Sequence, residues 1–131
     1  MSEVKVAYAG WHDPSDIGNI DNANSIPNVK IRAPNEKILR QNPLQIPIVL
    51  ALAIEGLDNG QHNLTVTCRP PYDYTDELTM YTRQFAAQSG EVKRLALKIA
   101  LPICMVGDYH FPVLVDGQPL ADVPLPIIWE T

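Results

Sequence analysis

The strongest constraint on the fold is the alternating stretch 106–117, Val-Gly-Asp-Tyr-His-Phe-Pro-Val-Leu-Val-Asp-Gly. Its odd-numbered residues from 109 to 115 are all large and apolar, whereas the residues between them are mixed. Because successive side chains of a β-strand point to opposite faces, this pattern predicts a strand with one buried face. The Asp-Gly pair at its end is a preferred hairpin turn, so we expect the chain to reverse there into another strand.

Similar alternating runs of apolar residues recur along the chain, separated by turn-forming residues. Each run is short and has the period of two that is typical of strands. One exception follows Asn35, which we expect to cap a single helical turn that ends before Pro43. The runs predict strands at about residues 4–9, 29–31, 45–55, 62–68, 78–85, 95–101, 106–115 and 123–129.

Two stretches carry more specific predictions. Segment 45–55 has large residues at its even positions and small ones between them, so the large ones are predicted to face the core. The turn that follows at 57–60, Leu-Asp-Asn-Gly, predicts a hairpin that spans 45–69. In the last run, Pro124 and Pro126 lack the N–H that a ladder needs, so we expect that strand at a sheet edge.

The chain of 131 residues has the size of one domain, 1–131, which can bury a core without a metal or a disulfide. Its 12 prolines and 7 glycines fit turns and strand edges better than helices. We therefore predict an all-β fold, an antiparallel two-sheet β-sandwich of about seven or eight strands with immunoglobulin-like or similar topology. The stretch 11–27, rich in Asp, Asn, Ser and Pro, is predicted to be an irregular loop.

Charge and hydropathy exclude several classes of partner. The formal net charge is -5 and the Lys and Arg residues are dispersed, whereas phosphate binding needs a concentrated positive patch. The longest apolar run, 46–54, is far shorter than a membrane span, and no basic, apolar leader opens the chain. We therefore expect no nucleic acid or membrane partner, a cytoplasmic location, and reduced thiols at Cys68 and Cys104.

The residue types that carry chemistry in enzymes form no recognised motif in this sequence. His12, His62 and His110 lack the close spacings of zinc ligands, and the oxygen-bearing residues of 11–27 lack the spacing of a calcium loop. No Gly-x-Ser-x-Gly sequence or glycine-rich phosphate loop is present. We predict no catalytic residues, no metal ligands and no cofactor, and we favour a non-enzymatic protein over an enzyme.

The C-terminal third carries a family resemblance. The motifs that carry it are Leu-Pro at 101–102, Gly-Asp-Tyr-His-Phe at 107–111, Val-Asp-Gly at 115–117 and Val-Pro-Leu-Pro-Ile at 123–127. This pattern resembles a family of uncharacterised bacterial proteins of similar length, defined as a domain of unknown function. The resemblance extends more loosely to 45–69 and does not include the stretch from Trp11. It implies a single β-sandwich domain and no particular activity.

For function, we expect a protein-binding or assembly module, such as an accessory subunit with a protein partner. Recognition residues collect in sandwich loops, and aromatic residues beside polar groups make common hot spots. An equally weighted alternative is that Trp11 plugs the core, because tryptophan is usually buried. The alternative functions are a small metal-dependent hydrolase and a homo-oligomeric structural protein. The predicted binding residues are Trp11, His12, Asp13, Asp16, Tyr72 and Tyr74.

Overall fold

The computed structural model describes residues 3–16, 25–71 and 78–130, most of them in strands. The elements are β1 (Lys5–His12), the 3-10 helix η1 (Pro14–Asp16), β2 (Val29–Ile31), α1 (Glu36–Gln41), β3 (Leu44–Glu55), β4 (Gly60–Cys68), β5 (Leu78–Ala87), β6 (Lys93–Ile103), β7 (Gly107–Val115) and β8 (Gln118–Trp129). The short helix begins as expected, because the Asn35 side chain accepts the N–H of Ile38 at 2.9 Å.

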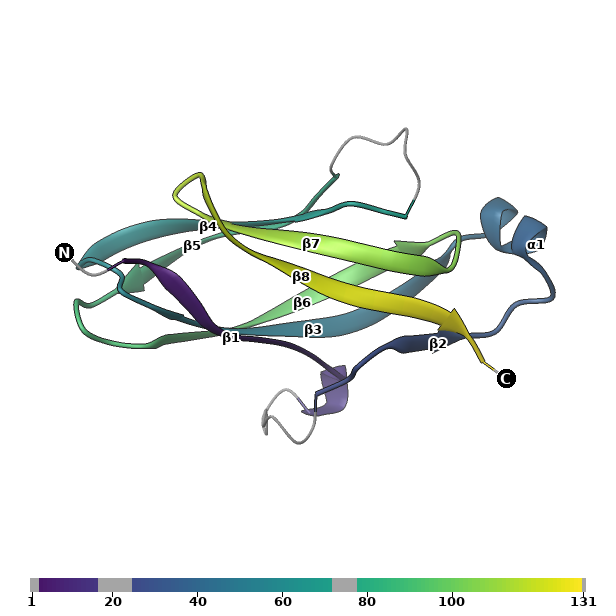
Figure 1. Cartoon of the computed structure of the whole chain (residues 1–131), viewed down its shortest axis with the longest axis horizontal. Helices are drawn as coiled ribbons and strands as arrows, with labels where there is room; N and C mark the ends of the chain where they lie inside the picture. The colour runs from purple at the N-terminus through teal and green to yellow at the C-terminus, as the bar shows by residue number, and fades with distance from the viewer. Residues whose placement is uncertain (1–2, 17–24, 72–77, 131) are drawn as a thin grey trace.

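The strands form two sheets that pack face to face (Figure 1). The first has the order β1-β3-β6, and the second has the order β2-β8-β7-β4-β5. All neighbouring strands are antiparallel except β2 and β8, which are parallel. The pairing of β3 with β6 in one sheet and of β8, β7 and β4 in the other is that of an immunoglobulin-like sandwich, so the predicted fold class is confirmed.

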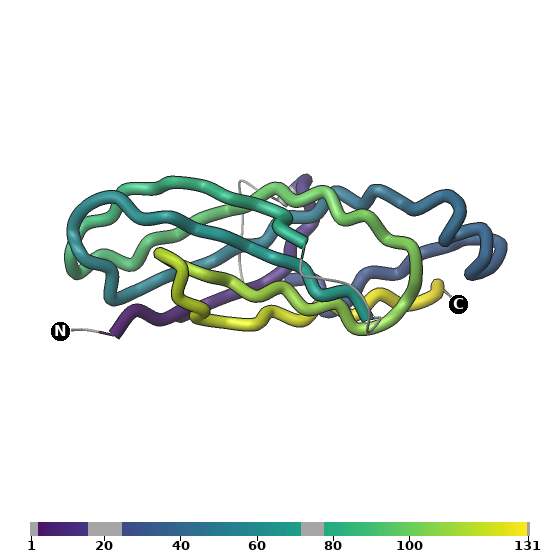
Figure 2. The backbone as a smooth tube through the Cα atoms, turned by 90° about the horizontal axis from the view of Figure 1, so that it is seen from above, coloured from purple at the N-terminus to yellow at the C-terminus, as the bar shows by residue number. Residues whose placement is uncertain are grey.

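The molecule is elongated, with α1 at one end and the β3–β4 and β5–β6 turns at the other (Figure 2). Among the described residues, no helix is long and apolar enough to cross a bilayer.

The core lies between the sheets and confirms the predicted parity of the strands. Leu50 and Leu97 from the first sheet and Tyr109, Phe111 and Val115 from the second belong to one buried cluster. Phe111 is fully buried, and its ring meets the Trp11 ring edge-to-face with 4.8 Å between the centroids. Residues two apart along a strand share a face, so the alternation in the sequence is sufficient to identify this set.

The predicted hairpin 45–69 is wrong, although both of its strands exist. Strand β3 pairs with β1 and β6, whereas β4 pairs with β5 and β7, so the turn between them passes from one sheet to the other. Both faces of β3 are buried from Ile48 to Ile54, which requires a strand neighbour on each side and a sheet packed over its large residues. The turn itself points inward, because Leu57 is 2 % exposed and contributes to the core.

The last strand is not a simple edge strand, which corrects the expectation from its prolines. Strand β8 lies between β2 and β7, and β2 pairs with residues 127–129. Pro124 and Pro126 precede this pairing, and their backbone groups point to the same side as those of Ile128 because they share its parity. The missing N–H groups therefore face a part of β8 that β2 does not reach, and no ladder bond is lost.

Tyr109 makes a contact that is typical of immunoglobulin-like sandwiches. Its hydroxyl donates to the carbonyl oxygen of Met105 at 2.9 Å, close to the start of β7. This is the tyrosine corner of immunoglobulin-like sandwiches, in which the tyrosine lies two residues before the second disulfide cysteine. Phe111 occupies that cysteine position here, so a buried aromatic ring replaces the disulfide.

Candidate functional site

Trp11 and His12 lie in β1 and not in a loop, so the predicted loop 11–27 begins too early. Trp11 is 3 % exposed, and its indole Nε1 donates to the carbonyl oxygen of Pro124 at 3.0 Å. The bond crosses the side of the sandwich where β1 contacts β8. Trp11 therefore plugs the core, the alternative that the sequence left open, and presents no exposed ring to a partner.

His12 is fully buried on the outer face of the three-stranded sheet. Its Nε2 is hydrogen-bonded to the Tyr8 hydroxyl at 2.9 Å, and its Nδ1 has no hydrogen-bond partner among the described residues. The tyrosine ring lies over Gly10, where an added Cβ would overlap the Tyr8 hydroxyl oxygen. A glycine at position 10 thus makes room for the Tyr8–His12 contact.

Two other predicted binding residues, Asp13 and Asp16, follow the end of β1. The exposed Asp13 carboxylate accepts the backbone N–H and the hydroxyl of Ser15, and these bonds lower the pKa of Asp13. Asp16 ends η1, and Tyr72 and Tyr74 lie outside the described residues. Within residues 3–16, 25–71 and 78–130, no group of three or more His, Cys, Asp and Glu side chains could hold a metal ion.

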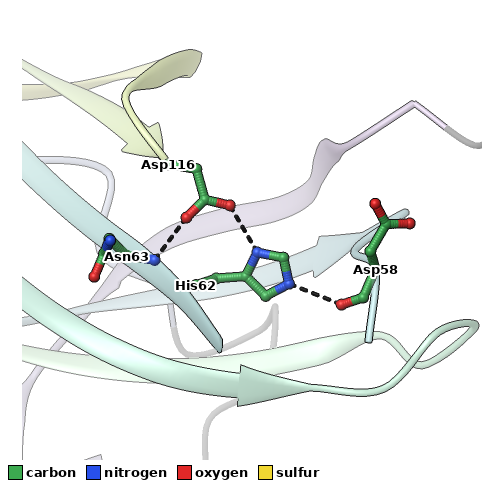
Figure 3. A network of polar contacts seen from close by, with 4 residues as sticks. All are labelled: Asp58, His62, Asn63 and Asp116. Carbon is green, nitrogen blue, oxygen red and sulfur yellow. Dashed lines mark hydrogen bonds and ion pairs between the residues drawn. The ribbon is translucent and has the colours of Figure 1, made fainter. Parts of the chain in front are cut away.

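A polar network that the sequence did not predict joins two turns at one end of the sandwich (Figure 3). His62 Nδ1 lies 2.7 Å from Asp116 Oδ2, and its Nε2 lies 2.8 Å from the backbone oxygen of Asp58. Asp116 Oδ1 also accepts the N–H of Asn63 at 2.8 Å. The ring stacks on Phe85 with 5.7 Å between centroids, and the side chain is 11 % exposed. The β7–β8 turn is thereby fastened to the β3–β4 turn.

The chemistry of this network is structural. Both partners of the His62 ring are acceptors, so both bonds form only when both ring nitrogens carry a hydrogen. An imidazole whose two nitrogens are both hydrogen-bonded donors has no free nitrogen that could accept a proton from a substrate. Asp116 also has a positive φ of 52°, so the contact stabilises a turn conformation that few non-glycine residues adopt. We interpret the network as a clamp between turns.

We expect the free energy of unfolding to decrease as the pH rises, because of His62. Hydrogen bonding to Asp116, and then to the Asp58 carbonyl, raises the pKa of His62 above its ordinary value of 6.5. A group whose pKa is raised by folding stabilises the folded state fully at pH values below its pKa in the unfolded state. This stabilisation is lost as the pH rises through its pKa in the folded state. The hydrogen bond from His62 lowers the pKa of Asp116 below its ordinary value of 3.8. The stabilisation that the ionised Asp116 contributes is therefore lost only as the pH falls through this lowered pKa.

Urea midpoints between about pH 5 and pH 9 would test this expectation. His62→Gln should lower the free energy of unfolding at about pH 6 by on the order of 1 kcal/mol, a modest loss because solvent screens the exposed Asp116 carboxylate. It should also reduce the decrease in the free energy of unfolding as the pH rises. His110→Gln is the matched control, because the exposed His110–Asp122 pair is separated by 3.5 Å. An undiminished decline in His62→Gln would assign the effect to another group.

The cysteines provide a separate prediction. Cys68 and Cys104 form no disulfide in the described part of the chain, and burial raises the pKa of Cys68 to about 11. At about pH 8, roughly one Cys68 in a thousand would carry a thiolate, and the thiolate is the reactive form. We therefore expect thiol titration to find two groups in unreduced, denatured protein, and Cys68 to react slowly in native protein. Finding no thiols after denaturation without reductant would contradict the expectation of reduced cysteines.

A local excess of positive charge lies on β5 and β6, which contact each other. These two strands contain 4 of the chain's 10 Lys and Arg residues and none of its 15 Asp and Glu residues. Three of the four cations are exposed, and none forms an ion pair in the part of the chain that the structure describes. We call this set the cationic seam; it comprises Arg83, Lys93, Arg94 and Lys98.

The sequence shows each of these cations but not their proximity. Arg94 and Lys98 alternate with the apolar residues of β6, a pattern that predicts an exposed face. Arg83 belongs to a strand in the other sheet, so its position beside β6 depends on how the sheets pack. Because the Lys and Arg residues are dispersed along the sequence, the local excess of positive charge on this acidic protein could not be predicted from the sequence.

The comparisons with known proteins assign no family. No protein-family model matches the chain, and a search of curated proteins finds no match. The resemblance to the bacterial family of β-sandwich domains stays a prediction.

Proposed function

We propose that the protein is a non-enzymatic binding module that captures an acidic protein partner through the cationic seam. The observation that carries the proposal is the set of four cations on β5 and β6 that have no carboxylate partner among the residues that the structure describes. The rest of the chain contains 6 Lys and Arg against 15 Asp and Glu, so the charge of the seam opposes that of the molecule. Such complementarity speeds the encounter with an acidic partner and disfavours like-charged ones.

The same charge argues against the homo-oligomeric alternative through this surface. If two copies paired antiparallel along β6 around Ala96, Arg94 of one copy would lie opposite Lys98 of the other. Like charges directly opposite each other on adjacent strands are destabilising. Association of copies through the seam is therefore disfavoured, and a different protein with opposite charge fits better.

Charge reversal tests the proposal. The variant Arg94→Glu/Lys98→Glu should lose the proteins that the wild type captures from native lysate, as compared by quantitative mass spectrometry. The control Lys30→Glu/Lys37→Glu changes the net charge equally at exposed positions outside the seam and should keep them. Urea midpoints would establish that both variants are folded. A captured set that is unaffected by the seam substitutions, or lost equally in the control, would contradict the proposal.

A further inference from the structure

The free edge of β6 offers backbone groups as well as charge. Strand β6 pairs with β3 on one side and has no strand neighbour on the other among the strands that the structure describes. In the β3–β6 ladder, Pro47 pairs with Ala100 and Pro102 pairs with Gln45. Hydrogen-bonded and non-hydrogen-bonded pairs alternate along an antiparallel ladder, so these two pairs, which are two residues apart, are of the same type. Neither proline has an N–H to donate, which fits the non-hydrogen-bonded type.

This assignment fixes which β6 residues face outward along the edge. Residues of the same parity as Pro102 direct both N–H and C=O away from β3. They are Arg94, Ala96, Lys98 and Ala100, which we call the β6 edge. Its backbone groups therefore have no ladder partner in the described part of the chain, and its two cations lie on one face, four residues or roughly 13 Å apart.

The edges of the five-stranded sheet, β2 and β5, are less suited to a partner. Strand β2 has three residues. Strand β5 places Arg83 opposite the core residue Leu64, on the inner face, and its pairing with β4 is interrupted by a register shift after Val66. Inward charges and bulges are features that discourage strand addition at an edge. The β6 edge has neither feature between Arg94 and Ala100.

An incompletely covered apolar surface lies on β5, the strand of the other sheet that contacts β6. At the β5 end near the β5–β6 turn, Phe85 and Ala87 are buried in the core. Toward the other end of β5 the apolar side chains are less completely buried: Leu78 is 44 % exposed, and Met80 and Tyr81 are half-buried. Apolar side chains on one face of an added strand would extend this cover, while acidic side chains on its other face would reach Arg94 and Lys98.

From these observations we infer that the β6 edge binds an extended, antiparallel segment of a partner protein in which acidic and apolar residues alternate. Backbone hydrogen bonds to the edge supply affinity, and alternate side chains supply specificity, as in strand addition generally. The inference rests on the proposed function, since it names the segment that the cationic seam receives. Carboxylates four residues apart on that segment would match the spacing of the two cations.

The direct probe is a capped peptide of about eight residues that alternates glutamate and valine, long enough to cover the β6 edge. Binding is measured by calorimetry and by NMR shifts at about 50 mM salt, and again at about 300 mM salt, where screening should weaken it. We expect Arg94→Gln/Lys98→Gln to reduce affinity by about tenfold. The control Lys30→Gln/Lys37→Gln should leave it unchanged.

Backbone pairing is tested separately from charge. Ala96→Pro removes an N–H that faces the free edge but no β3–β6 ladder bond, and should weaken binding by about three- to tenfold, whereas Ala96→Ser should not. A peptide with every second amide N-methylated loses the same bonds without a change in charge, so it tests pairing even if Ala96→Pro fails to fold. A peptide with four glutamates followed by four valines has the same composition without alternation.

The outcomes separate the inference from the proposed function. Binding that needs Arg94 and Lys98 could be equally strong for the alternating peptide, the N-methylated peptide and the peptide with four glutamates followed by four valines. That result would overturn strand addition and leave the cationic seam as a binding surface. Binding that is unaffected by Arg94→Gln/Lys98→Gln would overturn both. Tighter, seam-dependent binding of single-stranded DNA or of vesicles rich in phosphatidylserine would overturn the choice of a protein segment as the ligand.

Discussion

Replacing Phe111 with alanine is expected to lower the free energy of unfolding by about 3 to 5 kcal/mol. Phe111 is fully buried at the centre of β7 and packs edge-to-face on Trp11. Truncation removes its apolar area from the core and leaves a cavity that a framework held by strand pairing on both sides of β7 cannot easily fill. Urea unfolding followed by tryptophan fluorescence would measure the loss.

The neighbouring His110 provides the matched control for Phe111. It lies on the opposite face of the same strand and is exposed, so His110→Ala should change the stability by no more than about 0.5 kcal/mol. Similar urea midpoints for Phe111→Ala and the wild type would mean that the inward face of β7 is assigned incorrectly.

Replacing Trp11 with alanine is expected to have an effect of similar size, about 3 to 5 kcal/mol. The loss combines the buried ring with the hydrogen bond from Nε1 to the Pro124 carbonyl, which joins β1 to β8. Trp11→Phe isolates the second contribution, because it keeps an aromatic ring and leaves the carbonyl without its donor, at a cost of about 1 to 3 kcal/mol. Circular dichroism can follow unfolding, since these variants lack the Trp11 fluorophore.

Asp13→Ala distinguishes a core plug from a binding loop. Asp13 is two residues beyond Trp11 but exposed, so its substitution should leave the stability nearly unchanged. Equal losses at both positions would instead indicate that the whole segment is cooperatively anchored. Trp11→Ala and Phe111→Ala should be non-additive when combined, because the two rings are in contact.

The faces of the strands could be predicted from the sequence because each face depends on a local period of two. Residues 109, 111, 113 and 115 were assigned to the core from alternation alone, and all four are buried there. The pairing of strands could not be predicted in the same way. A turn such as 57–60 can join two neighbours in one sheet or pass between sheets, and alternation on either side is the same in both cases.

The candidate sites were harder to predict because they combine residues that are distant in sequence. His62 and Asp116 are 54 residues apart and meet through their two turns, so neither residue alone indicates the clamp. Arg83 and the cations of β6 come to the same side of the sandwich only because β5 and β6, which belong to different sheets, contact each other. Trp11 was assigned to a loop because Gly10 is usually a strand terminator, whereas here it accommodates the Tyr8 ring inside a continuing strand.

The position of β8 between β2 and β7 has a consequence for the order of folding during synthesis. The second sheet cannot be completed until residues 118–129 have left the ribosome, because β2 has no other neighbour in it. Until then the Trp11 indole also lacks its acceptor on Pro124, 113 residues further along the chain. Strand β2 therefore stays without its partner strand until β8 has been synthesised, whereas β1 can already pair with β3, and the contact of Trp11 with β8 forms only at that stage.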